Sequence, residues 1–265
     1  ELAEMGDMAE AGVVAFSDDG HYVENAAFMR RALEYSSMFN KMVIDHAEDI
    51  TLTKNGHMHE GIVSYELGVI GRPAVAEDLA VARDILLSEM TGGHIHIAHV
   101  SSKNTVDMVR RAKAKGLNVT CEVTSQHLSF TDEYLREYNP AFKMAPPIRS
   151  EDHRQALLEG LKDGTIDAII TDHAPHAYEE TDHEFCCAPN GFSGLETSLA
   201  AVITNAYGPD KLSIDQVVYY MSTRPAELMH LDAGVLEVGK PADITVFSTT
   251  EKWTVDRNKF YTKGK

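Results

Sequence analysis

The chain has little of several residue types, and each shortage excludes a class of protein. Its three cysteines, Cys121, Cys186 and Cys187, are too few for a disulfide framework in 265 residues and predict a reducing, cytoplasmic location. Lysine and arginine number 24 against 41 aspartates and glutamates, so nucleic acid and anionic membranes are poor partners for a net charge of −17. No apolar run approaches the roughly 20 residues that span a bilayer. The sequence therefore predicts a globular protein without a membrane helix or a signal peptide.

Short β-type runs alternate with longer helical patterns along most of the chain. The predicted helices include residues 77–90, 103–115 and 151–161, the second with Ser101 or Ser102 as its N-cap. Strands that alternate with helices indicate a parallel sheet, and polar residues gathered where strands end favour a (β/α) barrel. The predicted strands are residues 13–16, 42–44, 94–98, 119–123 and 166–170.

The number of strands bears on domain organisation. A closed barrel of this type has about eight βα units, and the sequence shows fewer. The chain opens in a predicted helix, residues 1–11, that leads straight into a strand, so we expect roughly three units to be missing from its start. We predict an α/β fold with an incomplete (β/α)8 TIM-type barrel over residues 1–232. Residues 233–265 are rich in β-type and turn residues and are predicted to form the C-terminal part of a small β-sandwich module.

Side chains that bind metals follow several predicted strands directly. His46, His99 and Asp172 each end an apolar run, and Asp18 and Asp19 follow the first strand. Because the carboxyl ends of parallel strands meet at one mouth of a barrel, we expect these side chains to lie close together. Imidazole and carboxylate suit zinc, whose catalytic sites keep one position open for water. A lone histidine is more often an ordinary core or surface residue, but several converging strand ends favour a metal-dependent active site.

Three other segments have metal-binding residue types in unfavourable positions. The His-x-His pattern at residues 57–59 lies in a polar loop with no apolar strand before it. The same pattern at residues 94–96 opens a strand, at the end opposite the predicted site. Residues 186–187 are adjacent cysteines without the spacing of a structural zinc site, and we expect them in a mobile loop with partly buried sulfurs. None of the three is predicted to bind the metal directly.

Short motifs spread over nearly the whole chain match one family of known proteins. They are Phe16-Ser17-Asp18-Asp19-Gly20, Asp45-His46-Ala47-Glu48, Gly71-Arg72-Pro73 with Glu77 and Arg83, His96-Ile97-Ala98-His99-Val100-Ser101-Ser102, Cys121-Glu122-Val123-Thr124 with His127-Leu128, Pro146-Pro147-Ile148-Arg149, Thr171-Asp172-His173-Ala174-Pro175-His176, and Gly194-Leu195-Glu196-Thr197. With these motifs the chain resembles the amidohydrolase superfamily, and within it the type I bacterial dihydroorotases. The closing segment at residues 239–244 is shared across the superfamily and is less specific.

The resemblance implies a metal-dependent hydrolase barrel and a zinc-dependent cyclic amidase. Its reaction would convert N-carbamoyl-L-aspartate reversibly into (S)-dihydroorotate in pyrimidine biosynthesis. The implied ligands of one or two zinc ions are His46, His99, Asp172 and Asp19, with Asp18 as the alternative to Asp19. Asp19 would replace a carboxylated lysine that bridges two metals in many relatives, and Asp172 would also be the catalytic proton shuttle.

The same resemblance implies how the substrate is bound and covered. His176 would contact the substrate carboxylate, and the backbone around Asn190 and Gly191 would hold the ring. The acidic loop at residues 177–188 is a candidate lid that excludes water.

The family also carries functional residues in barrel units that precede this chain. These are a His-x-His ligand pair and a substrate-binding arginine and asparagine, so we expect the chain alone to bind zinc weakly and to be inactive. Ala145 stands where many relatives have asparagine, and Gln126 stands where histidine is common.

Other interpretations stay open. Some dihydroorotase-like chains are non-catalytic partners of aspartate transcarbamoylase, and the retained ligand-type residues argue against that role here. Allantoinase or hydantoinase activity is less favoured, because no lysine lies at the first strand end. The expected partners are therefore a small-molecule substrate, a second copy of the chain in a homodimer, and aspartate transcarbamoylase.

Overall fold

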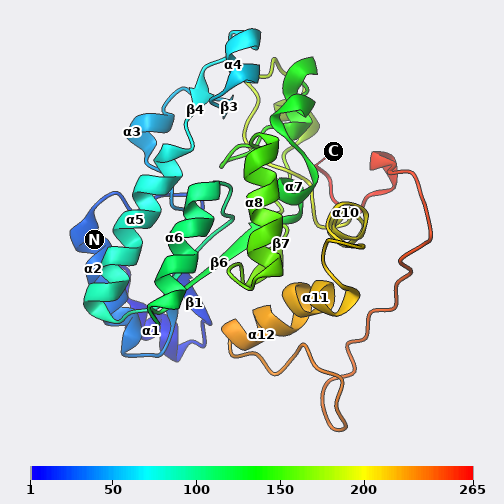
Figure 1. The fold of residues 1–265 in the computed structure, drawn as a ribbon. Helices are drawn as coiled ribbons and strands as arrows, with labels where there is room; N and C mark the ends of the chain where they lie inside the picture. Colours follow the sequence, from blue (N-terminus) through cyan, green and yellow to red (C-terminus); the bar gives the residue numbers. More distant parts are fainter. Residues whose placement is uncertain (1, 265) are drawn as a thin grey trace.

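A five-stranded parallel sheet forms the centre of the molecule, which is described for residues 2–264 by a computed structural model (Figure 1). Its strand order β1-β2-β5-β6-β7 follows the sequence, apart from two short strands, β3 and β4, that pair only with each other. Neighbouring strands pair in parallel throughout. The strands are β1 Ala15–Ser17, β2 Met42–Asp45, β3 Met58–His59, β4 Gly71–Arg72, β5 Ile95–Ile97, β6 Val119–Thr124 and β7 Ala168–Ile170.

Helices connect successive strands, and α5, α6 and α8 lie side by side over one face of the sheet (Figure 1). The helices are α1 Met5–Glu10, α2 Ala26–Ser37, α3 Ile50–Thr53, α4 Ile62–Leu67, α5 Val75–Thr91, α6 Lys103–Ala114, α7 Ser125–Ser129, α8 Glu151–Lys162, α9 Tyr178–Thr181, α10 Ser198–Asn205, α11 Ile214–Val218 and α12 Arg224–Leu228. Short 3-10 helices occupy η1 Asp132–Glu137, η2 Pro140–Phe142 and η4 Arg257–Lys259, and η3 Tyr219–Thr223 is a π-helical turn. No helix in residues 2–264 combines the length and the apolar character of a membrane span.

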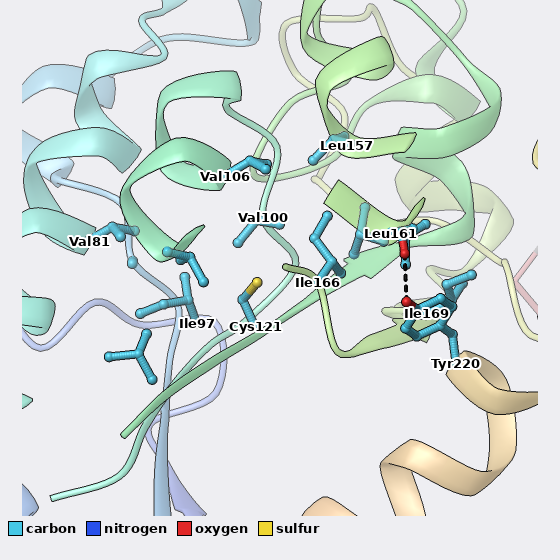
Figure 2. Packing of buried hydrophobic residues seen from close by; sticks show 14 of the residues in the cluster. Val81, Ile97, Val100, Val106, Cys121, Leu157, Leu161, Ile166, Ile169 and Tyr220 are labelled. Carbon is cyan, nitrogen blue, oxygen red and sulfur yellow. Dashed lines mark hydrogen bonds between the residues drawn. The ribbon is translucent and has the colours of Figure 1, made fainter. Parts of the chain in front are cut away.

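The two faces of the sheet differ in polarity because side chains alternate along each strand. In β6, Val119, Cys121 and Val123 belong to the main hydrophobic core, whereas Thr120 and Glu122 face the other side. Figure 2 shows Cys121 and its neighbours from β5 and β7 packed against side chains of α5, α6 and α8. Helices thus cover the apolar face of the sheet, and the opposite face is polar, as in the wall of a (β/α) barrel.

The strands expected from the sequence are confirmed and differ from the observed ones only at their ends. Ser102 is confirmed as the N-cap of α6, since its side chain accepts a hydrogen bond from the Asn104 N–H at 3.2 Å. The helix expected over residues 1–11 is observed as α1, which spans Met5–Glu10. Residue 1 lies outside the described residues. Periodicity and capping therefore located the main elements of the barrel wall.

The segment after α12 differs from its expected β structure. Residues 233–264 contain no strand, and η4 is their only helix among the described residues. They run as a largely exposed segment that leaves α12 and returns beside α10 (Figure 1). A β-type sequence needs a neighbouring strand to pair with, and no strand of residues 2–264 pairs with this segment. A separate module at residues 233–265 stays a prediction, with residue 265 outside the described residues.

A buried ion pair fixes the segment that follows β5. Glu77 and Arg149 are each at most 3% exposed, and Arg149 Nη2 lies 3.4 Å from Glu77 Oε2. Glu77 Oε1 accepts hydrogen bonds from the Ser101 and Ser102 N–H groups at 3.0 and 2.9 Å. Burial alone would raise the pKa of Glu77, but Arg149 and the hydrogen bonds from these serines hold it below its ordinary value. Glu77 therefore anchors the chain directly after His99.

Removing this carboxylate should destabilise the fold. Glu77→Ala leaves the buried Arg149 guanidinium without its carboxylate partner and two buried N–H groups without their acceptor, and should lower the free energy of unfolding of the full-length protein by about 3–5 kcal/mol. Urea denaturation measures the change. Glu159→Ala, which removes the exposed partner of Lys162, is the matched control and should change the unfolding free energy by less than about 0.5 kcal/mol. Equal effects at both positions would contradict the role of Glu77.

The depressed pKa of Glu77 also fixes the sign of a pH dependence. A carboxyl whose pKa is lower in the folded than in the unfolded state adds stability above its unfolded pKa, and this stability is lost as the pH falls through its folded pKa. The difference in unfolding free energy between wild type and Glu77→Gln should therefore be full above pH about 5 and should shrink on acidification. Denaturation curves at several pH values test this, and a difference that grows toward acid would refute it.

Candidate active site

Two of the predicted metal ligands meet because β2 and β5 are paired neighbours. Their register places Asp45 beside Ile97, and His46 and His99 follow just beyond these residues. Nδ1 of His46 lies 2.9 Å from Nε2 of His99, and the two rings meet edge to face with centroids 4.5 Å apart. Each histidine is 8% exposed. The two imidazole nitrogens therefore face each other in a nearly buried position at the carboxyl end of the sheet.

The surroundings of His99 keep its ring neutral. Burial, helped by the neighbouring His46 and His127 rings, holds the pKa of His99 well below its ordinary value. A neutral imidazole keeps a lone pair on one nitrogen, which is the form that binds a metal ion.

Asp172, which follows β7, interacts electrostatically with His46. Burial raises the pKa of Asp172, His46 lowers it, and Glu122 and Asp19 raise it, with a net upward shift. Of the two candidate bridging residues, Asp19 therefore acts on Asp172, although its own side chain is exposed. A half-buried carboxyl with a raised pKa takes up a proton more readily than an ordinary aspartate.

Three of the predicted ligands have an unusual backbone conformation. The φ angles of Asp19, His99 and Asp172 are 51°, 33° and 42°, in the left-handed region that non-glycine residues rarely adopt. Such a conformation costs roughly 1–2 kcal/mol per residue and persists where the surrounding structure enforces it, often at functional sites. The chain thus turns sharply at the ends of β1, β5 and β7, where the candidate ligands lie.

A carboxylate lies on the Nε2 side of the His46 ring, and a guanidinium pairs with that carboxylate. Glu48 Oε2 is 3.6 Å from His46 Nε2 and 2.8 Å from Arg72 Nη2. A carboxylate on the Nε2 side favours a proton on that nitrogen and leaves the lone pair on Nδ1, which faces His99. Glu48 and Arg72 lie in motifs noticed in the sequence, but only the fold shows their position behind the ligand.

The donor set can be compared with the needs of a zinc ion. Catalytic zinc takes about three protein ligands and an open position. His46 and His99 turn their nitrogens toward one another, as two ligands of one ion do, and Asp172 interacts with His46. However, no group of three or more histidine, cysteine, aspartate or glutamate side chains in residues 2–264 has the arrangement of a complete metal site. The described residues therefore bring two of the predicted ligands, His46 and His99, together without forming a complete metal site.

The three predicted substrate-binding residues form one cluster. His176 Nε2 donates a hydrogen bond to the Asn190 carbonyl at 2.8 Å. Gly191 is packed so closely against His176 that a Cβ atom there would come within 2.6 Å of the ring. The three residues thus lie together, and this packing explains why a glycine is required at position 191. Their role in substrate binding stays a prediction.

A cavity of about 1240 Å³ adjoins this cluster. His176, Gly191 and Phe192 line one part of its wall, and Trp253 and Phe260 of the C-terminal segment line another. The candidate metal ligands do not line it. The cavity therefore lies beside His176 and Gly191 rather than at the histidine pair.

The histidine patterns predicted not to bind metal make contacts within the chain. His94 Nε2 and His96 Nδ1 each lie 2.7 Å from the Thr120 hydroxyl. His59 belongs to strand β3, which corrects its assignment to a loop, and burial and Arg149 lower its pKa to about 3. Their exclusion as ligands stays a prediction.

Only part of the predicted lid, residues 177–188, is exposed to solvent. Residues 177–184 include α9 and are mostly exposed, but Phe185 and Ala188 are buried. Cys186 and Cys187 are both exposed, which corrects the expectation of partly buried sulfurs, because only their neighbours turn inward.

Gln126 has a structural contact that its sequence motif did not reveal. Its Nε2 donates a hydrogen bond to the Thr171 carbonyl at 2.6 Å, directly before Asp172. Although histidine is expected at this position in many relatives, glutamine here supports the end of β7.

Parallel strands covered by helices, with ligand-type residues at their carboxyl ends, define part of a (β/α) barrel. Solved structures agree: the L-hydantoinase (dihydropyrimidinase) of Arthrobacter aurescens aligns with a TM-score of 0.79 at 26% identity, over 90% of this chain and 56% of that one. A D-hydantoinase aligns with a TM-score of 0.78 at 22% identity, over 92% of this chain and 58% of that one, which shows the fold alone.

Sequence relatives then define the family. The model of the amidohydrolase family matches residues 2–264, and the chain belongs to that family. Proteins named dihydroorotase from Syntrophus aciditrophicus and Pelotomaculum thermopropionicum are 48% and 50% identical to it over 264 and 265 residues. The alignments cover the whole chain and 62% of each relative's length, so the chain spans less than two thirds of these proteins.

The left-handed backbone at Asp172 should lower the free energy of unfolding by an amount that can be measured separately from the loss of the carboxyl group. Asp172→Gly and Asp172→Ala both remove the half-buried carboxyl, but only glycine adopts this φ without strain. The glycine variant should therefore exceed the alanine variant in unfolding free energy by about 1 kcal/mol. Urea denaturation of the two full-length variants measures this difference, and an alanine variant as stable as the glycine variant would contradict strain at this position.

Proposed function

We propose that this chain is the larger part of a dihydroorotase, which interconverts N-carbamoyl-L-aspartate and (S)-dihydroorotate in pyrimidine biosynthesis. The observation that carries the proposal is the identity of 48–50% over the whole chain to proteins named dihydroorotase. The clustering of ligand-type and substrate-type side chains at the strand ends supports it. A cytoplasmic location, a homodimer and an association with aspartate transcarbamoylase stay predictions.

Zinc is the metal that the donor chemistry favours. His46 and His99 would each supply a neutral imidazole nitrogen, and Asp172 and Asp19 would supply carboxylate oxygens beside them. The remaining ligands would come from residues outside this chain. Zinc, when bound, polarises the amide carbonyl and lowers the pKa of water to about 7.

Asp172 would move the proton during ring opening. An attacking water must lose a proton, and the ring nitrogen must gain one before the C–N bond breaks. A carboxylate with a raised pKa accepts the first proton and donates it in the second step, and the reverse sequence closes the ring. Asp172 is the residue whose position and pKa fit this exchange.

The substrate side of the site would be formed by His176, Asn190 and Gly191. Because Nε2–H of His176 is donated to the Asn190 carbonyl, which fixes the ring orientation, the imidazole would donate to the substrate carboxylate from Nδ1 as an imidazolium. The close packing of Gly191 brings its backbone near that imidazole. Substrate carboxylate and ring would thus be held by adjacent groups.

The activity can be tested with purified full-length protein. Dihydroorotate should be hydrolysed, whereas hydantoin and allantoin should not. Asp172→Asn should lower kcat by about 10²–10⁴-fold, because it removes proton transfer by the carboxylate. Asp107→Asn, at an exposed carboxylate on α6, is the matched control and should retain activity.

Other outcomes would point to other functions. Preferential hydrolysis of hydantoin or allantoin would identify another cyclic amidase. A metal-free, inactive full-length protein that still binds aspartate transcarbamoylase would identify a non-catalytic partner.

A further inference from the structure

Lys143 is a buried lysine for which the reaction proposed above has no use. It is 3% exposed and follows η2, far in sequence from the strand ends. Its ammonium donates hydrogen bonds to the carbonyls of Ala188 at 2.6 Å and Cys186 at 3.1 Å. Burial of a charged group is costly unless its hydrogen bonds are satisfied, so these two carbonyls account for its inward position.

The backbone of Lys143 contacts the same segment at a second point. Its carbonyl accepts a hydrogen bond from the Gly191 N–H at 2.9 Å. One residue therefore binds both the start and the end of the segment 186–191. Asn190 within this segment is in turn held by His176.

Phe185 reinforces this attachment from the lid side. Its side chain is 4% exposed and belongs to a hydrophobic cluster with Met144 and Ile148. The Lys143 ammonium lies 5.5 Å from the Phe185 ring centroid, within the range of a cation–π interaction. The segment 186–191 is thus anchored at its base, whereas residues 177–184 before it are mostly exposed.

We propose that Lys143 is a positioning residue that holds segment 186–191 in the shape in which Asn190 and Gly191 contact the substrate. The proposal rests on the proposed function, because that function supplies the substrate contact. Lys143 does not itself touch the reacting atoms: its ammonium is directed at two backbone carbonyls. The exposed part of the lid would move about a base that Lys143 keeps fixed.

Hydrogen exchange of the full-length protein without substrate tests the structural half of the proposal. Lys143→Met keeps most of the aliphatic volume and removes both side-chain hydrogen bonds. Amides of residues 186–191 should exchange roughly tenfold faster, as expected when a charged hydrogen bond to a segment is lost. Lys162→Met, at a lysine that pairs with exposed Glu159 on α8, is the matched control and should leave this exchange unchanged.

Steady-state kinetics test the functional half. Loss of a preformed binding segment weakens substrate binding, so KM for dihydroorotate should rise roughly tenfold in Lys143→Met while kcat falls by less than about threefold. Lys143→Gln, which keeps an amide donor, should show a smaller rise in KM, and it serves as the test if the methionine variant does not fold.

The outcomes separate the two proposals. If the amides of residues 186–191 exchange at the same rate in Lys143→Met as in the wild type, Lys143 does not hold this segment, whatever the activity of the variant. Faster exchange with unchanged KM, or a loss confined to kcat, would overturn its role in substrate positioning. If wild-type protein does not hydrolyse dihydroorotate, both the proposed function and the role of Lys143 in substrate positioning are wrong. The exchange experiment then still decides whether Lys143 holds segment 186–191 in place.

Discussion

The parallel pairing of β2 with β5 is the constraint on which the candidate site depends. The two strands run in the same direction in fixed register, so the residues that follow them, His46 and His99, must emerge side by side. His46 Nδ1 and His99 Nε2 lie 2.9 Å apart, although the two residues are far apart in the sequence. β6 and β7 extend the same edge and bring Asp172 into electrostatic range of His46. The site is therefore a product of sheet geometry rather than of one continuous motif.

Buried charges hold the loops that follow these strands. Glu77 binds the backbone after His99, and Glu48 lies behind His46. The Lys143 ammonium donates a hydrogen bond to the Ala188 carbonyl. Charges of this kind add little net stability but are costly to disrupt, because a broken pair leaves one group buried and unsatisfied. Such contacts fix the backbone of the segments that they bind.

The parts of the fold that depend on local pattern could be predicted from the sequence. Apolar runs located the strands, and the polar residues after them located His46, His99 and Asp172 at one edge of the sheet. His176, Asn190 and Gly191 were singled out by the family resemblance as substrate-binding residues, and the structure places His176 against Asn190. In each case a short stretch of sequence contains the necessary information.

Features that depend on distant partners could not be predicted in this way. The inward position of Lys143 depends on carbonyls more than 40 residues further along the chain, at Ala188. Residues 233–264 have a β-type sequence but pair with no strand of the described chain. The exposure of Cys186 follows from the burial of its neighbour Phe185, which the cysteine spacing did not reveal.

The proposed function requires that the paired histidines at the ends of β2 and β5 bind the metal of a zinc hydrolase. Zinc content of the purified full-length protein, measured by mass spectrometry of the metal, tests it most directly. The account predicts bound zinc in the wild type, a marked loss in His46→Ala and in His99→Ala, and retention in His57→Ala, at a histidine predicted not to be a ligand. Zinc retained equally in all three variants would contradict it.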